Sequence, residues 1–222
     1  MASERFSRQA SIVGEEGQYT LHKTRAVIVG CGGLGSQVIT NLVSAGVGSF
    51  ILVDGDTVAE SNLNRQFIHF GHLGHMKVDS AEEWILRADP DASVTKHACM
   101  LTSGNADSIV AEGDVVIDCL DNIPSRHILA ESCRRKGKTL IHGGVEGMYG
   151  QVAVFPSDSP VRLESIINGS DSEHASIAPA VSAVGAVMAS ETIECILGRC
   201  RECRLTTLDL SAGRMERRRL SS

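Results

Sequence analysis

Hydrophobic and polar positions along the chain follow two periods, one typical of strands and one typical of helices. Short apolar runs predict buried strands, and apolar residues recurring every three or four positions predict amphipathic helices. The strands predicted in the first two thirds of the chain cover 25–29, 50–53, 94–99, 114–119 and 139–142, and the helices cover 36–45, 77–88, 105–112 and 124–135. This alternation predicts an α/β fold with a Rossmann-like, doubly wound, mostly parallel sheet.

The pattern changes after Gly143-Gly144, where strict alternation typical of antiparallel strands replaces the buried runs. A small-residue helix lies among these strands, and a hairpin-like turn joins the last two. The predicted C-terminal strands cover 151–155, 204–210 and 214–220, the turn 211–213 and the helix 177–197. We therefore expect one domain, 1–222, in which C-terminal antiparallel strands extend the parallel sheet.

Two segments lie outside this pattern. Residues 1–24 form an N-terminal arm, and residues 156–174 form a long crossover loop with almost no periodicity. Loops of that length are usually functional or disordered, and the pattern does not decide between the two. The apolar stretch at 177–197 is interrupted, so we expect no membrane-spanning segment. Residues 1–14 lack an apolar stretch of signal-peptide length, so we expect a cytoplasmic protein.

Composition and charge narrow the classes further. A chain of 222 residues that is 42% hydrophobic can bury one substantial core. The net charge of −6 argues against a nucleic-acid partner, and we interpret the basic cluster 214–219 as a solvated edge strand and tail. Seven cysteines without framework spacing predict reduced thiols, most of them small buried hydrophobes.

A glycine loop follows the first predicted strand and opens the first helix. Its glycines, Gly30, Gly32, Gly33 and Gly35, match the pattern G-x-G-x-x-G. Glycine lets the backbone approach a phosphate closely, and the N–H groups at a helix N-terminus favour an anion. Asp54 closes the second strand 19 residues after Gly35, where an acid receives ribose hydroxyls. These features fit NAD as well as ATP; a tight structural turn is the alternative without a ligand.

A polar cluster after Asp54 favours ATP. Asn62, Arg65, Gln66 and Lys77 bring two cations and two amides within sixteen residues. Such groups can bind a triphosphate and offset the charge that develops on it, which hydride transfer does not require. Each cation taken singly more often lies on a solvated surface, so the argument depends on their joint position.

Asp121 follows the fourth predicted strand, at the edge of the sheet where ligands bind in such folds. A carboxylate there can hold Mg²⁺ against phosphates. The alternative is an Asx-turn or an N-cap for the helix that begins near Pro124.

Taken together, these motifs resemble the ThiF/MoeB/HesA family, the bacterial relatives of the ubiquitin-activating enzymes. The resemblance runs in order from about Arg5 to about Leu220. The segments that carry it are 5–9 (RFSRQ), 30–35 (GCGGLG), 54–56 (DGD), 61–66 (SNLNRQ), 118–122 (DCLDN) and 150–155 (GQVAVF).

The resemblance implies an adenylyltransferase that uses ATP and Mg²⁺. Its substrate would be the C-terminal glycine carboxylate of a ubiquitin-like sulfur carrier, similar to ThiS or MoaD and ending in Gly-Gly, and pyrophosphate would be released. The implied pathway is thiamine or molybdopterin sulfur transfer. By motif, the roles fall on these residues: Asp54 on the ribose, Asp56 and Gln66 in the nucleotide site, Asn62, Arg65 and Lys77 on the phosphates, Asp121 on Mg²⁺, and Arg8 reaching the phosphates from the partner subunit of a homodimer.

Two departures from the family pattern concern cysteines. Family members often hold zinc with two Cys-x-x-Cys pairs, whereas this chain has only Cys200 and Cys203 at that spacing. We expect no zinc within one chain, although two chains could share a site. No cysteine lies between Arg134 and Glu194, where relatives place the one that forms a thioester or persulfide. We therefore expect a separate protein to donate the sulfur, with Cys200 or Cys203 as the alternative.

Three other functions remain open from the sequence. The substrate could be a small-molecule carboxylate instead of a protein. The chain could be a non-catalytic nucleotide-binding scaffold that pairs with a catalytic homologue, although Arg8, Arg65, Lys77 and Asp121 are all present. The interpretation as an NAD-dependent oxidoreductase would depend on the glycine loop and Asp54 alone.

Overall fold

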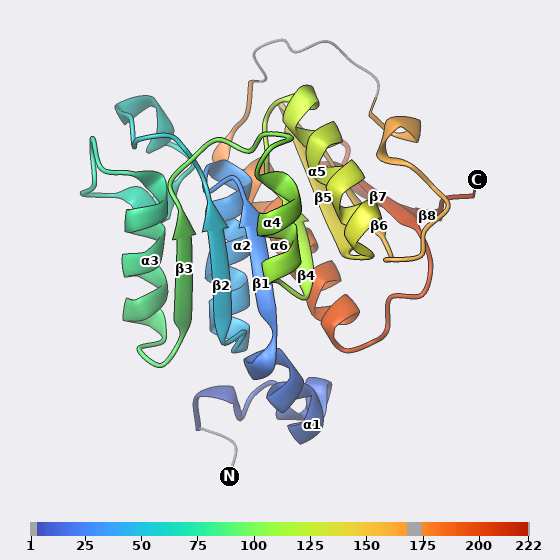
Figure 1. The fold of residues 1–222 in the computed structure, drawn as a ribbon, viewed down its shortest axis with the longest axis horizontal. Coiled ribbons are helices and arrows are strands. Elements are labelled where there is room, and N and C mark those ends of the chain that lie inside the picture. The colour runs from blue at the N-terminus through green and yellow to red at the C-terminus, as the bar shows by residue number, and fades with distance from the viewer. Residues whose placement is uncertain (1–3, 168–174, 222) are drawn as a thin grey trace.

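The structure is a computed structural model that describes residues 4–167 and 175–221 (Figure 1). Its centre is an eight-stranded sheet in the order β3-β2-β1-β4-β5-β6-β7-β8. Strands β1 to β5 pair in parallel, and β6, β7 and β8 continue the sheet as antiparallel strands. The predicted α/β fold, with its mostly parallel sheet and antiparallel extension, is confirmed.

The bounds of the elements agree closely with the prediction. The strands are β1 (Arg25–Val29), β2 (Ser49–Val53), β3 (Ser93–His97), β4 (Val115–Asp118), β5 (Thr139–Glu146), β6 (Tyr149–Phe155), β7 (Arg204–Asp209) and β8 (Arg214–Arg219). The α-helices are α1 (Ala10–Lys23), α2 (Gly33–Ala45), α3 (Lys77–Ala88), α4 (Ala106–Glu112), α5 (Ile123–Lys136) and α6 (Ala178–Ile196). Short 3₁₀ turns lie at Glu4–Phe6, Glu60–Asn62, Phe67–His69 and Leu163–Ser165.

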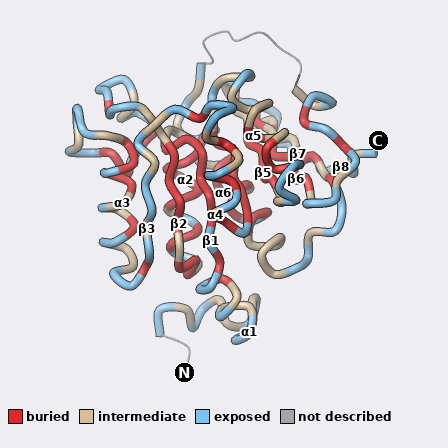
Figure 2. The backbone as a smooth tube through the Cα atoms, in the orientation of Figure 1, coloured by how far each residue is buried: buried red, intermediate tan, exposed pale blue. Residues whose placement is uncertain are grey.

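Helices cover both faces of the sheet. Helices α2, α3 and α6 pack on one face, and α4 and α5 pack on the other (Figure 1). Alternate side chains of β1 are therefore buried on opposite faces of the sheet. Ala26 and Ile28 belong to the core under α2, and Val27 and Val29 belong to the core under α4 and α5. A strand buried on both faces is apolar throughout, and Figure 2 shows the central strands as largely buried.

Strand β5 runs four residues further than predicted. The sequence Gly143-Gly144 resembles a strand end, but both residues pair with β6. A Cβ atom on Gly143 would lie 2.1 Å from the sulfur of Met188 on α6. Glycine is present here because the helix packs directly on the strand, a contact that local sequence does not reveal.

The N-terminal arm contains helix α1, interrupted at Gly14, whose φ of 73° is not helical. The arm packs beneath the C-terminal end of α2, where the side-chain amides of Gln9 and Gln18 donate to the carbonyl oxygen of Ala45. It therefore lies at the end of the molecule opposite the carboxyl ends of the parallel strands (Figure 1).

Helix α6 is long and apolar enough to cross a membrane by length and composition alone, so the interruptions in its apolar stretch do not keep it below that limit, and the expectation that it spans no membrane stays a prediction. Its surroundings in the structure are protein: it packs against α2, β5 and β6. It also carries a buried acid, Glu191, which accepts hydrogen bonds from Arg204 on β7 and Arg217 on β8. The predicted solvated edge strand is β8, and Arg217 is the member of its basic cluster that ties it to α6.

The cysteines are partly as expected. Cys31, Cys99, Cys119, Cys133 and Cys203 are free thiols, and all but Cys99 are buried. Cys195 and Cys200, at the end of α6, form a disulfide, so the prediction of reduced thiols is wrong for this pair. The helix ends between these two residues and its final turn brings their Cα atoms to 4.5 Å.

The crossover loop is described up to residue 167 and again from 175. Within the first part, Val161 and Leu163 are buried against the core under α5. Cys203 lies beside this part, with its sulfur 2.7 Å from the hydroxyl oxygen of Ser159. The remainder, 168–174, lies outside the described residues, as do residues 1–3 of the arm.

Candidate nucleotide-binding site

A cavity of about 650 Å³ opens at the carboxyl ends of the parallel strands, within the range of about 300–1,000 Å³ usual for ligand pockets. Its walls come from the segments that follow β1, β2 and β4, together with residues near the end of β5 and the start of α6. The site residues predicted from the sequence that line it are Gly30, Gly32, Gly33, Asp54, Asp56, Asn62, Arg65, Gln66, Lys77 and Asp121.

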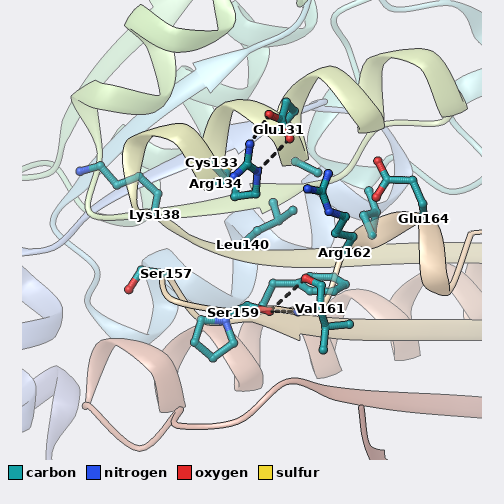
Figure 3. A pocket seen from close by; sticks show the side chains of 14 residues that line it. Glu131, Cys133, Arg134, Lys138, Leu140, Ser157, Ser159, Val161, Arg162 and Glu164 are labelled. Carbon is teal, nitrogen blue, oxygen red and sulfur yellow. Dashed lines mark hydrogen bonds and ion pairs between the residues drawn. The ribbon is translucent and has the colours of Figure 1, made fainter. Parts of the chain in front are cut away.

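A second cavity lies between α5, the sheet and residues 156–164 (Figure 3). Its volume is about 40 Å³, room for only about three waters. Three of the charged groups at its rim are engaged: Arg134 pairs with Glu131, and the Lys138 ammonium donates to the carbonyl oxygen of Gly113. The larger cavity is therefore the candidate functional site.

The glycine loop brings the start of α2 against this cavity. A Cβ atom on Gly35 would lie 2.0 Å from the carbonyl oxygen of Gly30, so the tight passage from β1 into α2 requires glycine at that position. Helix α2 begins at Gly33 with no side-chain cap. Because the first N–H groups of a helix have no partner within it, this end offers donors to an anion.

Asp54 connects the glycine loop to the segment after β2. One of its carboxylate oxygens accepts from the backbone N–H of Cys31 at 2.7 Å, and the other accepts from that of Asp56 at 2.8 Å. Burial raises the pKa of this carboxyl group, and the nearby Lys77 ammonium lowers it in part. Asp54 thus fixes the shape of the loop as well as lining the cavity.

Lys77 is the first residue of α3 and is 7% exposed. Its ammonium nitrogen lies 2.7 Å from a carboxylate oxygen of Asp56. This ion pair holds the positive charge at the cavity wall, because Asp56 itself is anchored through Asp54 and the backbone N–H of Lys77 donates to the Asp56 carbonyl oxygen.

Arg65 and Gln66 lie over the glycine loop. Cβ atoms built on Gly33 and Gly32 would lie 3.8 Å from Cγ of Arg65 and 3.4 Å from the amide nitrogen of Gln66. The Arg65 guanidinium donates to the carbonyl oxygen of Ser61 and to the side chain of Asn64. Gln66 is 3% exposed, and its amide oxygen has no partner among the described residues.

Asn62 has a local role beside its predicted one. Its amide oxygen accepts from the backbone N–H of Ala59 at 3.0 Å and closes the 3₁₀ turn Glu60–Asn62. This turn carries the chain from β2 back toward the glycine loop, so Asn62 helps to direct Arg65 into the cavity.

Asp121 is exposed at the cavity edge, and it is not the cap of α5. That role belongs to Asn122, whose side-chain oxygen accepts from the backbone N–H of Ser125 at 3.0 Å. In the parts of the chain that the structure describes, no three His, Cys, Asp or Glu side chains converge as a metal site. A single carboxylate suits Mg²⁺ that is held mainly by phosphates.

Arg8 is exposed in the N-terminal arm and does not line the cavity of its own chain. The arm packs at the opposite end of the strands (Figure 1). Any contact of Arg8 with a nucleotide therefore requires a second subunit, which is the arrangement predicted from the sequence.

Sequence reasoning missed a buried polar network behind the cavity. Asp118, His142 and Arg126 come from the end of β4, from β5 and from the first turn of α5. Nδ1 of His142 lies 2.7 Å from the Asp118 carboxylate, and Nε2 lies 3.3 Å from the Arg126 guanidinium. A histidine inside the apolar strand at 139–142 was the signal that could have indicated it.

The family model for the ThiF family matches residues 6–222. The chain belongs to the ThiF family. Among curated relatives, it is 34% identical over 204 residues to the molybdopterin-synthase adenylyltransferase of Escherichia coli, covering 87% of this chain and 82% of that protein. It is 39% identical over 160 residues to the SAMP-activating enzyme E1 of Haloferax volcanii, covering 71% of this chain and 59% of that one.

Other relatives of this ThiF-family chain are longer. It is 33% identical to the adenylyltransferase and sulfurtransferase UBA4 of Eremothecium gossypii, matching 88% of this chain but 47% of that protein. Among solved structures, the Escherichia coli MccB bound to ATP superposes with a TM-score of 0.86 at 20% identity, covering 98% of this chain and 72% of the other. PaaA superposes with a TM-score of 0.81 at 21% identity, covering 97% and 72%. These two likenesses concern the fold.

Proposed function

We propose that this protein is an ATP-dependent adenylyltransferase that activates the C-terminal glycine carboxylate of a ubiquitin-like sulfur carrier. The observation that carries the proposal is the joint position of Arg65 and Lys77, which line one cavity with the glycine loop. The names of relatives support it, because adenylyltransferases and a SAMP-activating enzyme E1 are among them.

The chemistry follows from the charges. A carboxylate is ionised at neutral pH, so it needs no general base to attack the α-phosphorus of ATP. One carboxylate oxygen forms a bond to that phosphorus, the bond to the bridging oxygen breaks, and pyrophosphate leaves with the electron pair. The protein's task is to position two anions and to neutralise their repulsion, for which the cations at the cavity wall are suited.

Several residues take distinct parts in this proposal. The N-terminal end of α2 and the side chains of Arg65 and Lys77 bind the phosphates, and Asp54 receives the ribose. Asp121 would hold Mg²⁺, which supplies charge neutralisation of the phosphates when bound. Arg8 would complete the site from a second subunit of a homodimer.

The finer features are proposals as well. We infer a carrier similar to ThiS or MoaD, ending in Gly-Gly and serving thiamine or molybdopterin sulfur transfer in the cytoplasm. We also infer a separate sulfur donor. No cysteine lies between Arg134 and Glu194, and the free thiol of Cys203 is buried.

The test is ATP–pyrophosphate exchange with purified carriers that end in Gly-Gly. Arg65→Ala is expected to lower the exchange rate by about a hundredfold or more, as loss of a charge-stabilising donor does. The matched control is Arg87→Ala, which removes an exposed arginine on α3 that pairs with Glu83 and should leave the rate unchanged. An Arg65→Ala rate within a few-fold of wild type would refute the assignment, and exchange with a small carboxylate but no carrier would change the substrate class.

A further inference from the structure

The network behind the cavity places a histidine between an acid and an arginine. Asp118 and His142 are cross-strand neighbours in the register of β4 and β5, and both are fully buried. Arg126 arrives from α5 and lines the cavity. One end of its guanidinium contacts His142, and the other donates to the carbonyl oxygen of Leu120, next to Asp121.

The hydrogen bonds define which ring nitrogen of His142 carries the proton. Arg126 is always protonated and can only donate, so Nε2 of His142 must accept. The side-chain nitrogen of Gln151 also lies 3.4 Å from Nε2. Nδ1 must then carry the proton, which it donates to the Asp118 carboxylate at 2.7 Å. His142 is a neutral ring with a fixed tautomer.

The charges of the groups that face the ring agree with this arrangement. Burial lowers the pKa of His142, and Arg126 lowers it further, although Asp118 acts in the opposite direction. Burial alone would raise the pKa of Asp118, but Arg126 and the hydrogen bond from His142 bring it below its ordinary value. Asp118 is therefore the permanent anion of the network, and Arg126 is its permanent cation.

The position of Arg126 in the sheet order indicates which substrate it meets. Asp54 and Lys77 lie on the β2 side of the glycine loop, whereas Arg126 lies over β4 and β5, on the other side. An attacking oxygen approaches phosphorus from the face opposite the leaving group. If the glycine loop, Arg65 and Lys77 hold the phosphates as proposed, the attacking carboxylate would enter from the side of Arg126. Arg126 lines the cavity, and its buried Nε–H has no partner among the described residues, so the hydrogen bonds within the chain do not fully satisfy this guanidinium.

We propose that Arg126 receives the substrate carboxylate, and that His142 is the positioning residue that holds the Arg126 guanidinium in place. The inference rests on the proposed adenylation, because it assigns the part of the same cavity that binds the carboxylate substrate. Asp118 fixes the tautomer of His142, and Gln151 supports the same ring nitrogen. The bond from Arg126 to Leu120 couples this position to the loop that carries Asp121.

Two replacements of His142 separate this role from a purely structural one. A Gln side chain places its amide oxygen near the position of Nε2 and can still accept from Arg126. An Asn side chain places its amide nitrogen near Nδ1 and keeps the bond to Asp118 but cannot reach Arg126. His142→Asn should lower kcat/KM for the carboxylate substrate by about tenfold or more, the size expected for a lost hydrogen bond to a charged group, and His142→Gln by about threefold at most. The Kd for Mg·ATP should stay unchanged in both.

A double-mutant cycle adds a second readout. Arg126→Met should lower kcat/KM for the carboxylate more than either His142 variant, and His142→Asn should then cause little further loss because the two residues act as one unit. Additive losses, equal losses in the Asn and Gln variants, or a loss confined to ATP affinity would overturn the positioning role. The two failures are distinguishable: a wild-type protein without exchange overturns adenylation and the role of Arg126 together, whereas an active wild type with additive losses overturns the role of His142 alone.

A spectroscopic measurement on the wild-type chain covers the case in which the variants do not fold. Nitrogen chemical shifts of the His142 ring at neutral pH should show a protonated Nδ1 and an unprotonated, hydrogen-bonded Nε2. A doubly protonated ring, or a ring protonated at Nε2, would overturn the inference without any variant.

Discussion

Replacing Glu191 tests the one acid buried within helix α6. Its side chain is 2% exposed and faces Arg204, whose side chain is 15% exposed, and Arg217, whose side chain is 55% exposed. Glu191→Met keeps the length of the side chain and removes its charge. The change leaves the Arg204 guanidinium largely buried without a counter-charge, because β7 holds it against the helix.

The expected cost follows from these exposures. Breaking a buried ion pair by removing one partner typically costs about 3–5 kcal/mol. The Arg217 side chain can rotate to face solvent, so the loss of its pair with Glu191 should cost only as much as the loss of a surface ion pair, about 0–1 kcal/mol. Since Arg204 also retains some contact with solvent, we expect the lower end, about 3 kcal/mol in the free energy of unfolding. For a domain of this length, that corresponds to a Tm about 6–12 °C lower.

Urea denaturation and a thermal scan measure both quantities. Glu194→Met is the matched control: it removes an acid from the same helix, but its pair with Arg199 is exposed, and its cost should stay below about 0.5 kcal/mol. A second substitution, Arg204→Met in the Glu191→Met background, should restore much of the loss, because no unpaired charge remains. A Glu191 variant as stable as the Glu194 control would refute the reasoning.

Two further predictions concern the glycine loop and the buried histidines. Gly35→Ala places a Cβ 2.0 Å from the Gly30 carbonyl oxygen, so we expect this variant to show no binding of Mg·ATP by calorimetry. The control is Gly104→Ala, whose Cβ would lie 3.7 Å from its nearest atom and which should bind Mg·ATP normally. Normal binding by both variants would contradict the role of the glycine loop. Burial lowers the pKa of His69 and of His142, so the unfolded state takes up protons first as the pH falls below about 6.5, and the free energy of unfolding should decrease there. Urea titrations at about pH 7 and 5.5 should show a smaller decrease for His142→Gln, and an equal decrease would contradict the assignment.

The parts of the fold that are encoded locally could be predicted from the sequence. Strand β1 and helix α3 have their predicted bounds, because a buried β-branched run and a one-sided apolar stripe each depend on neighbours along the chain. The cavity residues were predictable for a related reason. Gly32 precedes the first residue of α2, Lys77 is the first residue of α3, and Arg65 lies in the segment that joins β2 to α3, so the topology brings them to one edge of the sheet.

The remaining features depend on contacts between distant segments. Helix α1 escaped prediction because its sequence contains Gly14 and Gly17 and its role is to cap the end of α2. Likewise, nothing in the neighbourhood of His142 or Glu191 in the sequence specifies Arg126 or Arg204 as a partner. Such pairs form only when the sheet sets their strands side by side.

The margin of the sheet formed by β8 has a consequence for solubility. A free strand margin presents unpaired N–H and C=O groups that can recruit a strand from another molecule. Every residue of β8 is exposed, and four of its six residues are arginines. If two molecules approached through this margin, their rows of guanidinium groups would face each other. Charge repulsion therefore opposes the addition of strands from neighbouring molecules to this edge of the sheet.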